Sequence, residues 1–297
     1  MNLGPTTLHS VSYAGLWGQA TLDLEHFIDR AADLGYQGVM LMAKRPHLSV
    51  LDCDAQTCAR LRHKLESRKL AAVCIAGYTN FTADQEHGEI PHREMQIHHV
   101  GELARLAHEL GASLVRVYTG YESTAAPYAA QWNSVVDSLR ECAWRAASYG
   151  VTIGVQNHHD LAAGYEQMFD LIRAIGEPNC RAMFDAWAAF LHGADLPAAA
   201  RRMAPITVHT TIADYQLRPR YRYRPDVVNY TPAEPLVQAV PMGTGAIDYA
   251  GFLRALGHGG FRGSIAYEMC SPLQDGGKME ILDRYARIFL DYLAALG

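Results

Sequence analysis

The 297-residue sequence has no uninterrupted apolar run near the 18 residues that a membrane-spanning helix requires. Its first ten residues, MNLGPTTLHS, lack the basic stretch and apolar block of a secretory signal, so we expect a cytoplasmic protein with no membrane partner. Basic side chains do not dominate, because 26 Lys and Arg stand against 31 Asp and Glu, giving a net charge of −5 at pH 7. This balance argues against nucleic acid as a partner held by bulk charge attraction.

Closely paired cysteines are also missing. The six cysteines are dispersed and none forms a Cys-x-x-Cys pair, which argues against a disulfide framework and against a closed structural zinc site. Hydrophobic residues make up 49% of the chain, and no break in composition or internal repeat marks a domain boundary. We therefore expect one domain over residues 1–297, with a core large enough to need no crosslinks.

Short apolar segments alternate with amphipathic segments along the whole chain, and eight of the short ones are typical of buried parallel strands. These are residues 7–13, 37–44, 70–78, 113–120, 151–159, 180–187, 206–212 and 263–270. The intervening segments repeat apolar residues at helical spacing. Eight strands, each followed by a helix, predict an α/β fold of the (β/α)8 TIM barrel type. An open doubly wound sheet is the alternative, but no glycine-rich phosphate loop follows the first strand.

The longest stretch without predicted structure is a loop over about 216–246, after the seventh strand. It interleaves arginines with tyrosines in the run LRPRYRYR. Such a loop can bind a sugar, an anionic group or an aromatic ring, and we take Arg218 and Arg220 as candidate substrate ligands. The alternative is a solvated loop or a subunit contact.

In a barrel of this type the site lies at the carboxyl ends of the strands. The last four barrel strands carry polar side chains there, namely Gln156, Asp185, His209 and Glu268. Their oxygen and nitrogen atoms suit a divalent metal ion, with Mn²⁺ preferred and Mg²⁺, Co²⁺ or Zn²⁺ as alternatives. The competing interpretation is that each is an isolated strand-end residue that caps a helix or bonds a loop.

Further candidates lie at the same rim. His158 shares a strand face with Gln156 and has an ordinary pKa suited to proton transfer, so we take His158 and Glu268 as candidate bases. The alternative role for His158 is to orient a ligand residue. Candidate substrate contacts follow or lie on other strands: His9, Lys44, Tyr78 and Trp187.

Several motifs spread over nearly the whole chain resemble the sugar phosphate isomerase/epimerase superfamily, the xylose isomerase-like barrels. They are AADLGYQGV, VQNHHD, MFDAW, VHTTIAD, AYEMC and MGTGAIDYAGFLRALGHGGFRGSIAYE. The resemblance implies a metal held by Glu, Asp, His and Glu from the fifth to eighth strands, positions that fall on Gln156, Asp185, His209 and Glu268. Gln156 stands where the family has its first Glu, and Ala188 stands where the family often has a histidine, three residues after the Asp.

This resemblance implies an enzyme that moves a proton next to the carbonyl of a keto-sugar or related polyol, through an enediolate, as an isomerase or epimerase. Because Gln156 is no base, it argues against a two-carboxylate epimerase mechanism, and a lyase that eliminates an aglycone from a 3-keto-glycoside is the alternative. A non-catalytic barrel subunit, whose pocket a partner completes, is a third hypothesis. Homo-oligomers are the tendency among barrels of this kind.

Overall fold

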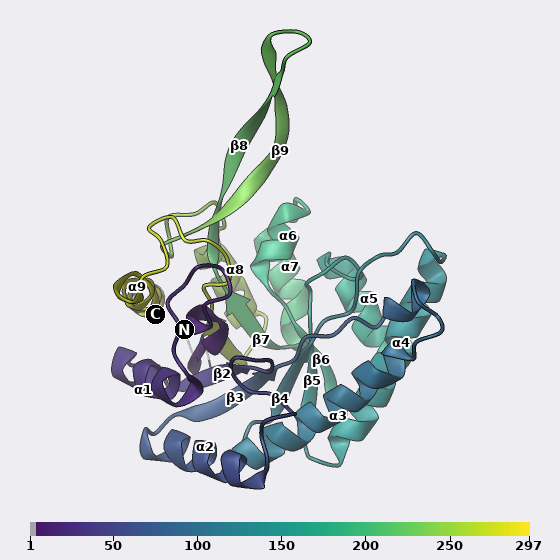
Figure 1. Cartoon of the computed structure of the whole chain (residues 1–297), viewed down its shortest axis with the longest axis vertical. Helices are drawn as coiled ribbons and strands as arrows, with labels where there is room; N and C mark the ends of the chain where they lie inside the picture. Colours follow the sequence, from purple (N-terminus) through teal and green to yellow (C-terminus); the bar gives the residue numbers. More distant parts are fainter. Residues whose placement is uncertain (1–3) are drawn as a thin grey trace.

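The computed structural model describes residues 4–297 and shows eight parallel strands closed into a barrel with helices around it (Figure 1). The order around the barrel is β1-β10-β7-β6-β5-β4-β3-β2, and β2 pairs with β1 to close it. The strands are β1 (Thr6–His9), β2 (Gly38–Met42), β3 (Ala71–Ala76), β4 (Leu114–Val117), β5 (Thr152–Gln156), β6 (Cys180–Met183), β7 (Thr207–Ile212) and β10 (Ser264–Tyr267). The (β/α)8 barrel predicted from the sequence is confirmed.

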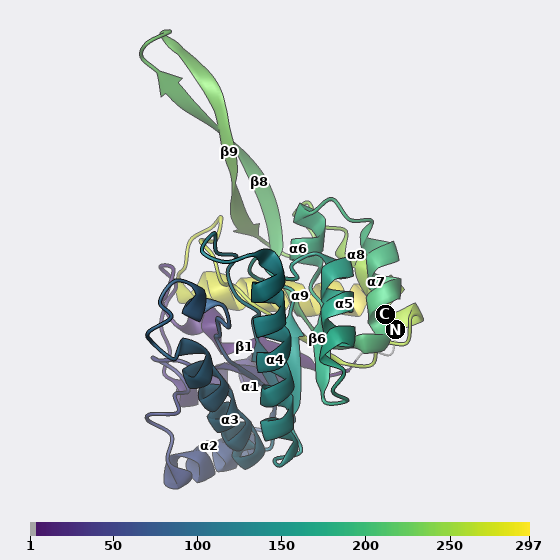
Figure 2. The same ribbon diagram turned by 90° about the vertical axis from the view of Figure 1, so that its right-hand side faces the viewer.

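Helices connect consecutive strands and cover the outside of the barrel (Figure 2). They are α1 (Leu24–Leu34), α2 (Ala55–Ser67), α3 (His92–Leu110), α4 (Tyr128–Ala147), α5 (Tyr165–Ile175), α6 (Ala186–Leu191), α7 (Leu196–Met203), α8 (Tyr249–His258) and α9 (Met279–Leu296). Local sequence sets several of their ends. The side chain of Asp195 accepts a hydrogen bond from the backbone of Ala198 to begin α7. Gly35 ends α1 in the left-handed conformation that glycine adopts without strain.

Two layers of side chains fill the molecule. The main core lies between the barrel and its helices, and a smaller apolar cluster is formed by alternate strand residues that include Met40, Cys74, Leu114 and Met183. Because side chains on a strand alternate between faces, these residues fill the barrel interior. No helix within residues 4–297 combines the length and apolar character needed to cross a membrane.

Some expected strands end earlier than the apolar pattern predicted. The first strand stops at His9, where the ring nitrogen Nδ1 accepts a hydrogen bond from the backbone of Val11 and begins a 3-10 helix over Ser10–Tyr13. Two further 3-10 turns cover Ala83–Gln85 and Ala204–Ile206. Apolar composition identified the buried segment but not this side-chain cap, which redirects the backbone.

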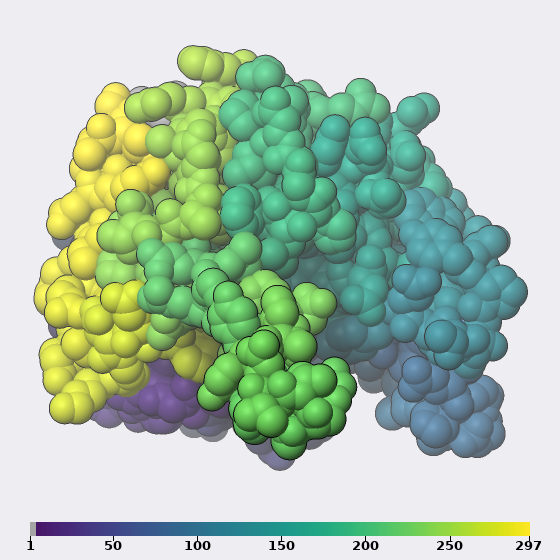
Figure 3. Space-filling model, turned by 90° about the horizontal axis from the view of Figure 1, so that it is seen from above, coloured from purple at the N-terminus to yellow at the C-terminus, as the bar shows by residue number. Residues whose placement is uncertain are grey.

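The segment predicted as a loop over about 216–246 is instead largely a β-hairpin. Strands β8 (Asp214–Arg224) and β9 (Asn229–Val240) pair antiparallel and stand away from the barrel at the carboxyl end of the strands (Figures 1 and 2). Most of its side chains are exposed, so its strands lack the apolar face that marks a strand in a sequence. The segment was therefore predicted as a loop. Seen from above, the surface is hollowed beside the hairpin (Figure 3).

Candidate active site

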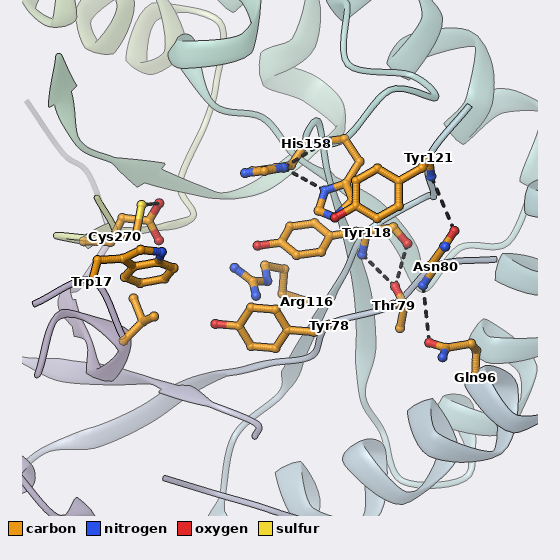
Figure 4. Close-up of a pocket in the computed structure, with 13 residues that line it drawn as sticks. Trp17, Tyr78, Thr79, Asn80, Gln96, Arg116, Tyr118, Tyr121, His158 and Cys270 are labelled. Carbon is orange, nitrogen blue, oxygen red and sulfur yellow. Dashed lines mark hydrogen bonds between the residues drawn. The ribbon is translucent and has the colours of Figure 1, made fainter. Parts of the chain in front are cut away.

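A cavity of about 380 Å³ lies at the carboxyl ends of the barrel strands. Its wall is aromatic on several sides, and the groups capable of charge or proton transfer that line it include Arg116, His158 and Glu268. Figure 4 shows Arg116 lying between the rings of Tyr78 and Tyr118, with Cys270 across the cavity. The location is the one expected for a barrel enzyme.

Arg116 places a charged guanidinium in the barrel interior, with the residue only 1% exposed. Its Nε and Nη2 donate to the carbonyl oxygen of Gly77 at 3.3 and 3.0 Å, and its Nη1 donates to Oε1 of Gln156 at 3.2 Å. Burial alone disfavours the charged form, but Tyr118, Tyr78 and Glu268 nearby raise the pKa of Arg116 overall. The guanidinium is therefore a permanent positive charge at the base of the site.

Gln156 and Asp185 form the next links of a buried polar chain. The amide Nε2 of Gln156 donates to Oδ2 of Asp185, while Oδ1 of Asp185 accepts from the backbone N–H of Thr211 at 2.6 Å. Burial raises the pKa of Asp185 to about 7, and the hydrogen bonds from Thr211 and Gln156 oppose that shift. Both oxygens of this carboxylate therefore already have hydrogen-bond donors.

Two buried histidines face the barrel interior. Nδ1 of His209 lies 2.6 Å from Oγ of Ser264, and its Nε2 is buried without a partner. His9 likewise has a buried Nε2 without a partner. Burial lowers the pKa of His209 to about 3 and lowers that of His9 well below its ordinary value, so both rings are neutral.

Glu268 follows β10 and lines the main cavity. The thiol of Cys270 donates to its Oε1 at 3.2 Å. Burial raises the pKa of Glu268, while the charge of Arg116 and the Cys270 hydrogen bond oppose the shift. A partly desolvated carboxylate of this kind is a stronger base than one in water.

The structure brings the four predicted metal ligands together only in part: Gln156 contacts Asp185, and Glu268 is near enough for its charge to raise the pKa of Asp185. Asp185 lines a second cavity of about 340 Å³, whereas Glu268 lines the main cavity. Within residues 4–297, no three His, Cys, Asp or Glu side chains lie close enough together to hold a metal ion. Both oxygens of Asp185 accept hydrogen bonds, and so does the Oε1 of Gln156. The donor to Gln156 is the cationic side chain of Arg116. As they lie, these residues do not fit the metal arrangement that the family resemblance implies.

His158 lies at the rim, where it borders both cavities. Its Nδ1 is 2.7 Å from Nδ1 of His159, and both rings pack against Tyr118, with centroid separations of 4.9 and 4.3 Å. Desolvation, with Arg116 nearby, lowers the pKa of both histidines to about 4. His158 is therefore neutral near pH 7 and a weaker base than an ordinary imidazole.

The predicted substrate contacts divide into two groups. Tyr78 lines the main cavity, and Nζ of Lys44 lies 4.1 Å from the centroid of its ring. Trp187 lines the second cavity and packs against Tyr215 at a centroid distance of 4.3 Å. His9 is inside the barrel and faces neither cavity.

The arginines of the hairpin lie elsewhere. Arg218 donates to the side chains of Gln238 and Gln274, at 2.8 and 2.9 Å. Arg220 is exposed, and neither arginine lines the main or the second cavity.

Arg116 and Tyr118 were missed in the sequence analysis. Both belong to the apolar segment SLVRVYTG, and Arg116 stands between two valines on a barrel strand. Strand alternation puts Leu114, Arg116 and Tyr118 on one face, the face opposite those valines. A charge inside a buried strand pattern was the available signal, because such a residue requires internal partners.

Comparison with known proteins places this barrel in a class. The sequence model described as xylose isomerase-like TIM barrel matches residues 28–285. The chain belongs to this family. A search of curated protein sequences finds no match.

Solved structures share the fold at low sequence identity. A D-psicose 3-epimerase from Clostridium cellulolyticum H10, described with D-tagatose, has a TM-score of 0.77 and 15% identity, with 98% of this chain and 99% of that chain covered. A probable 3-DHS dehydratase of petrobactin synthesis from Bacillus anthracis has a TM-score of 0.73 and 16% identity, with 96% of this chain and 98% of that chain covered. A protein named IOLI, with a zinc atom bound, has a TM-score of 0.75 and 15% identity, with 99% of each chain covered. At these identities the likeness establishes the fold.

Proposed function

We propose that this protein is an isomerase or epimerase that transfers a proton next to the carbonyl of a keto-sugar or related polyol, through an enediolate. The observation that carries the proposal is the pairing of a buried carboxylate, Glu268, with a fixed cation, Arg116, in one cavity at the catalytic end of the barrel. Membership of a family with epimerases among its structural neighbours supports the same class of reaction.

In this proposal Glu268 accepts the proton from the carbon next to the carbonyl. Burial keeps water from competing for the carboxylate and makes it more basic. Neutral His158, beside Tyr118, lines the same cavity and is the second group for proton transfer. Tyr78 and Tyr118 supply flat walls of the kind that pack against the apolar face of a sugar ring.

A metal ion remains a prediction from the sequence, with Mn²⁺ preferred. The IOLI protein is described with a bound zinc atom, which supports a cation in a barrel of this fold. Because the predicted ligands of this chain do not fit such an ion as they lie, we route no step through it.

The test is solvent exchange. The protein is incubated in D2O with D-fructose, D-psicose, D-tagatose and L-ribulose in turn, and deuterium at the carbons next to the carbonyl is followed by proton NMR. We expect exchange with at least one ketose, and Glu268→Gln is expected to lower its rate by about 10²–10⁴-fold. Glu280→Gln, at an exposed position of α9, is the matched control. No exchange with any ketose would contradict the proposal.

The aromatic wall favours a second candidate, a lyase that eliminates a phenolic aglycone from a 3-keto-glycoside. Trp17, Tyr78, Tyr118 and Tyr121 all line the main cavity, more aromatic surface than a sugar ring alone requires. In this reaction loss of the proton next to the ketone expels the aglycone. The 3-keto form of 4-nitrophenyl glucoside distinguishes the candidates, because elimination releases coloured 4-nitrophenolate and simple exchange does not.

A further inference from the structure

We propose that the guanidinium of Arg116 supplies the positive charge that polarises the substrate carbonyl in this barrel, in the place where the family resemblance implies a divalent metal. This inference rests on the proposed proton-transfer function and assigns its electrophile. It is carried by four features: the position of Arg116, its fixation, its free donors and the neutral residue beside it.

The position follows from strand register. On β4, Arg116 pairs with Ala76 of β3 on one side and with Gly154 of β5 on the other. Ala76 is among the smallest residues and leaves interior volume for a long side chain, whereas the space beside Gly154 is taken by Met183 and Leu114. The head of that side chain then reaches the cavity that Glu268 lines.

Fixation comes from three hydrogen bonds and two aromatic rings. Gly77 and Gln156 accept from Nε, Nη2 and Nη1, and the guanidinium carbon lies 4.7 and 4.3 Å from the ring centroids of Tyr78 and Tyr118. A guanidinium has five N–H donors, and these contacts use three. Two donors, one on each terminal nitrogen, remain for a substrate oxygen. Donors held in place before the reaction stabilise developing charge without reorganisation.

The neutral neighbour explains the departure from the family pattern. A Glu at position 156 would form a buried ion pair with Arg116 and cancel its charge toward a ligand. Gln156 accepts the same hydrogen bond without a charge and passes its own N–H on to Asp185. Gln156 and Arg116 therefore act together. The neutral amide of Gln156 is a poor metal ligand, but it holds the guanidinium without cancelling its positive charge.

The chemical step balances within this site. The Glu268 carboxylate takes the proton from the carbon beside the carbonyl, and the C–H electron pair becomes the carbon–carbon double bond of the enediolate. The carbonyl π pair moves onto oxygen, whose negative charge the free N–H groups of Arg116 bind. Return of the proton from Glu268 to the same face regenerates the carbonyl and the free carboxylate. Inversion instead takes a proton delivered to the opposite face, and Glu268 then releases its own proton to water. No oxidant or reductant is needed.

The decisive measurement is Mn²⁺ binding by calorimetry on EDTA-treated protein, with no substrate present. We expect wild type to bind Mn²⁺ no tighter than about millimolar. The double variant Arg116→Met, Gln156→Glu removes the cation and restores the family's acid, so its affinity is expected to rise by at least about 100-fold, which is some 2.7 kcal/mol. Stoichiometric binding to wild type at micromolar Mn²⁺ would overturn the proposal.

Deuterium exchange provides the second readout. Exchange by wild type is expected to persist in EDTA, to fall about 10²–10³-fold in Arg116→Gln, and to recover in part in Arg116→Lys, which restores a charge without the planar donors. Arg254→Gln, at an exposed position of α8, is the control, and circular dichroism verifies that each variant is folded. Exchange that EDTA abolishes and Mn²⁺ restores would contradict the role of Arg116 but leave the proposed function intact. No exchange under either condition would contradict the proposed function itself, and with it the catalytic role of Arg116.

Discussion

At the scale of single residues, this barrel is marked by polar groups buried without full hydrogen bonding. Nε2 of His9 and Nε2 of His209 are both buried without a partner, close to the permanently charged Arg116. An unsatisfied buried nitrogen costs stability, so native proteins keep such atoms mainly where function needs them. Because both rings stay neutral, they add no charge repulsion with the nearby Arg116.

His9 predicts a pH dependence of stability. Its pKa in the folded state lies well below the ordinary 6.5, because of burial first and of the charge of Arg116 second. Below pH 6.5 the unfolded chain therefore binds a proton that the folded chain resists, and the free energy of unfolding decreases as the pH falls. His9→Asn keeps an acceptor for the backbone of Val11 but removes the titration, so its stability is expected to fall less between pH 7 and pH 5.

Urea unfolding of both proteins at the two pH values measures this difference. His63→Asn, on the exposed side of α2, is the control for removing a histidine. An equal loss of stability in wild type and His9→Asn would show that His9 is not the group responsible.

At the scale of elements, the outer part of the β8–β9 hairpin stands apart from the barrel, while its base, with Tyr215 and Val240, is buried against it. From Arg218 to its tip nearly every side chain is exposed, including Tyr221, Val228 and Tyr230 at 66, 77 and 63%. Two-stranded ribbons gain little stability from their own side-chain pairs, so the hairpin contributes little to folding.

Shortening the hairpin tests this separation. Residues 219–235 are replaced by Asn-Gly, which joins the register partners Arg218 and Leu236 by a two-residue turn. We expect the free energy of unfolding to change by less than about 1 kcal/mol, since the deleted residues are largely exposed.

We also expect unchanged deuterium exchange, because Arg220 lines neither the main nor the second cavity. A raised KM in the shortened protein would instead support the sequence-based assignment of Arg220 as a substrate ligand.

At the scale of the whole molecule, contacts between the two ends of the chain hold the closed barrel. Asp283 of α9 is buried and accepts hydrogen bonds from Arg30 of α1, at 2.7 Å, and from the hydroxyl of Tyr13, at 3.0 Å. The same two regions meet where β1 pairs with β10. Asp283 therefore links the last helix to the first strand–helix unit.

Removing that link is expected to weaken the whole fold. Asp283→Ala leaves the buried hydroxyl of Tyr13 without its acceptor, so the free energy of unfolding is expected to fall by about 1–3 kcal/mol. The lost ion pair with Arg30 adds little to this, because Arg30 is partly exposed and screened by solvent. Thermal unfolding checks it, with Asp291→Ala on α9 as the matched control. Equal melting temperatures for wild type and Asp283→Ala would contradict a closing role.

The amino-acid pattern alone predicts the barrel and the rim on which polar groups gather, because alternation of apolar and polar residues is a local property of strands and helices. It placed Glu268, His158 and Tyr78 at that rim for the same reason. Which of these groups meet follows from the closed sheet. It brings Gly77, Arg116, Gln156 and Asp185 into one buried chain, although they are up to 108 residues apart. Which atoms approach one another across a closed sheet depends on the register of its strands, and no local pattern encodes that.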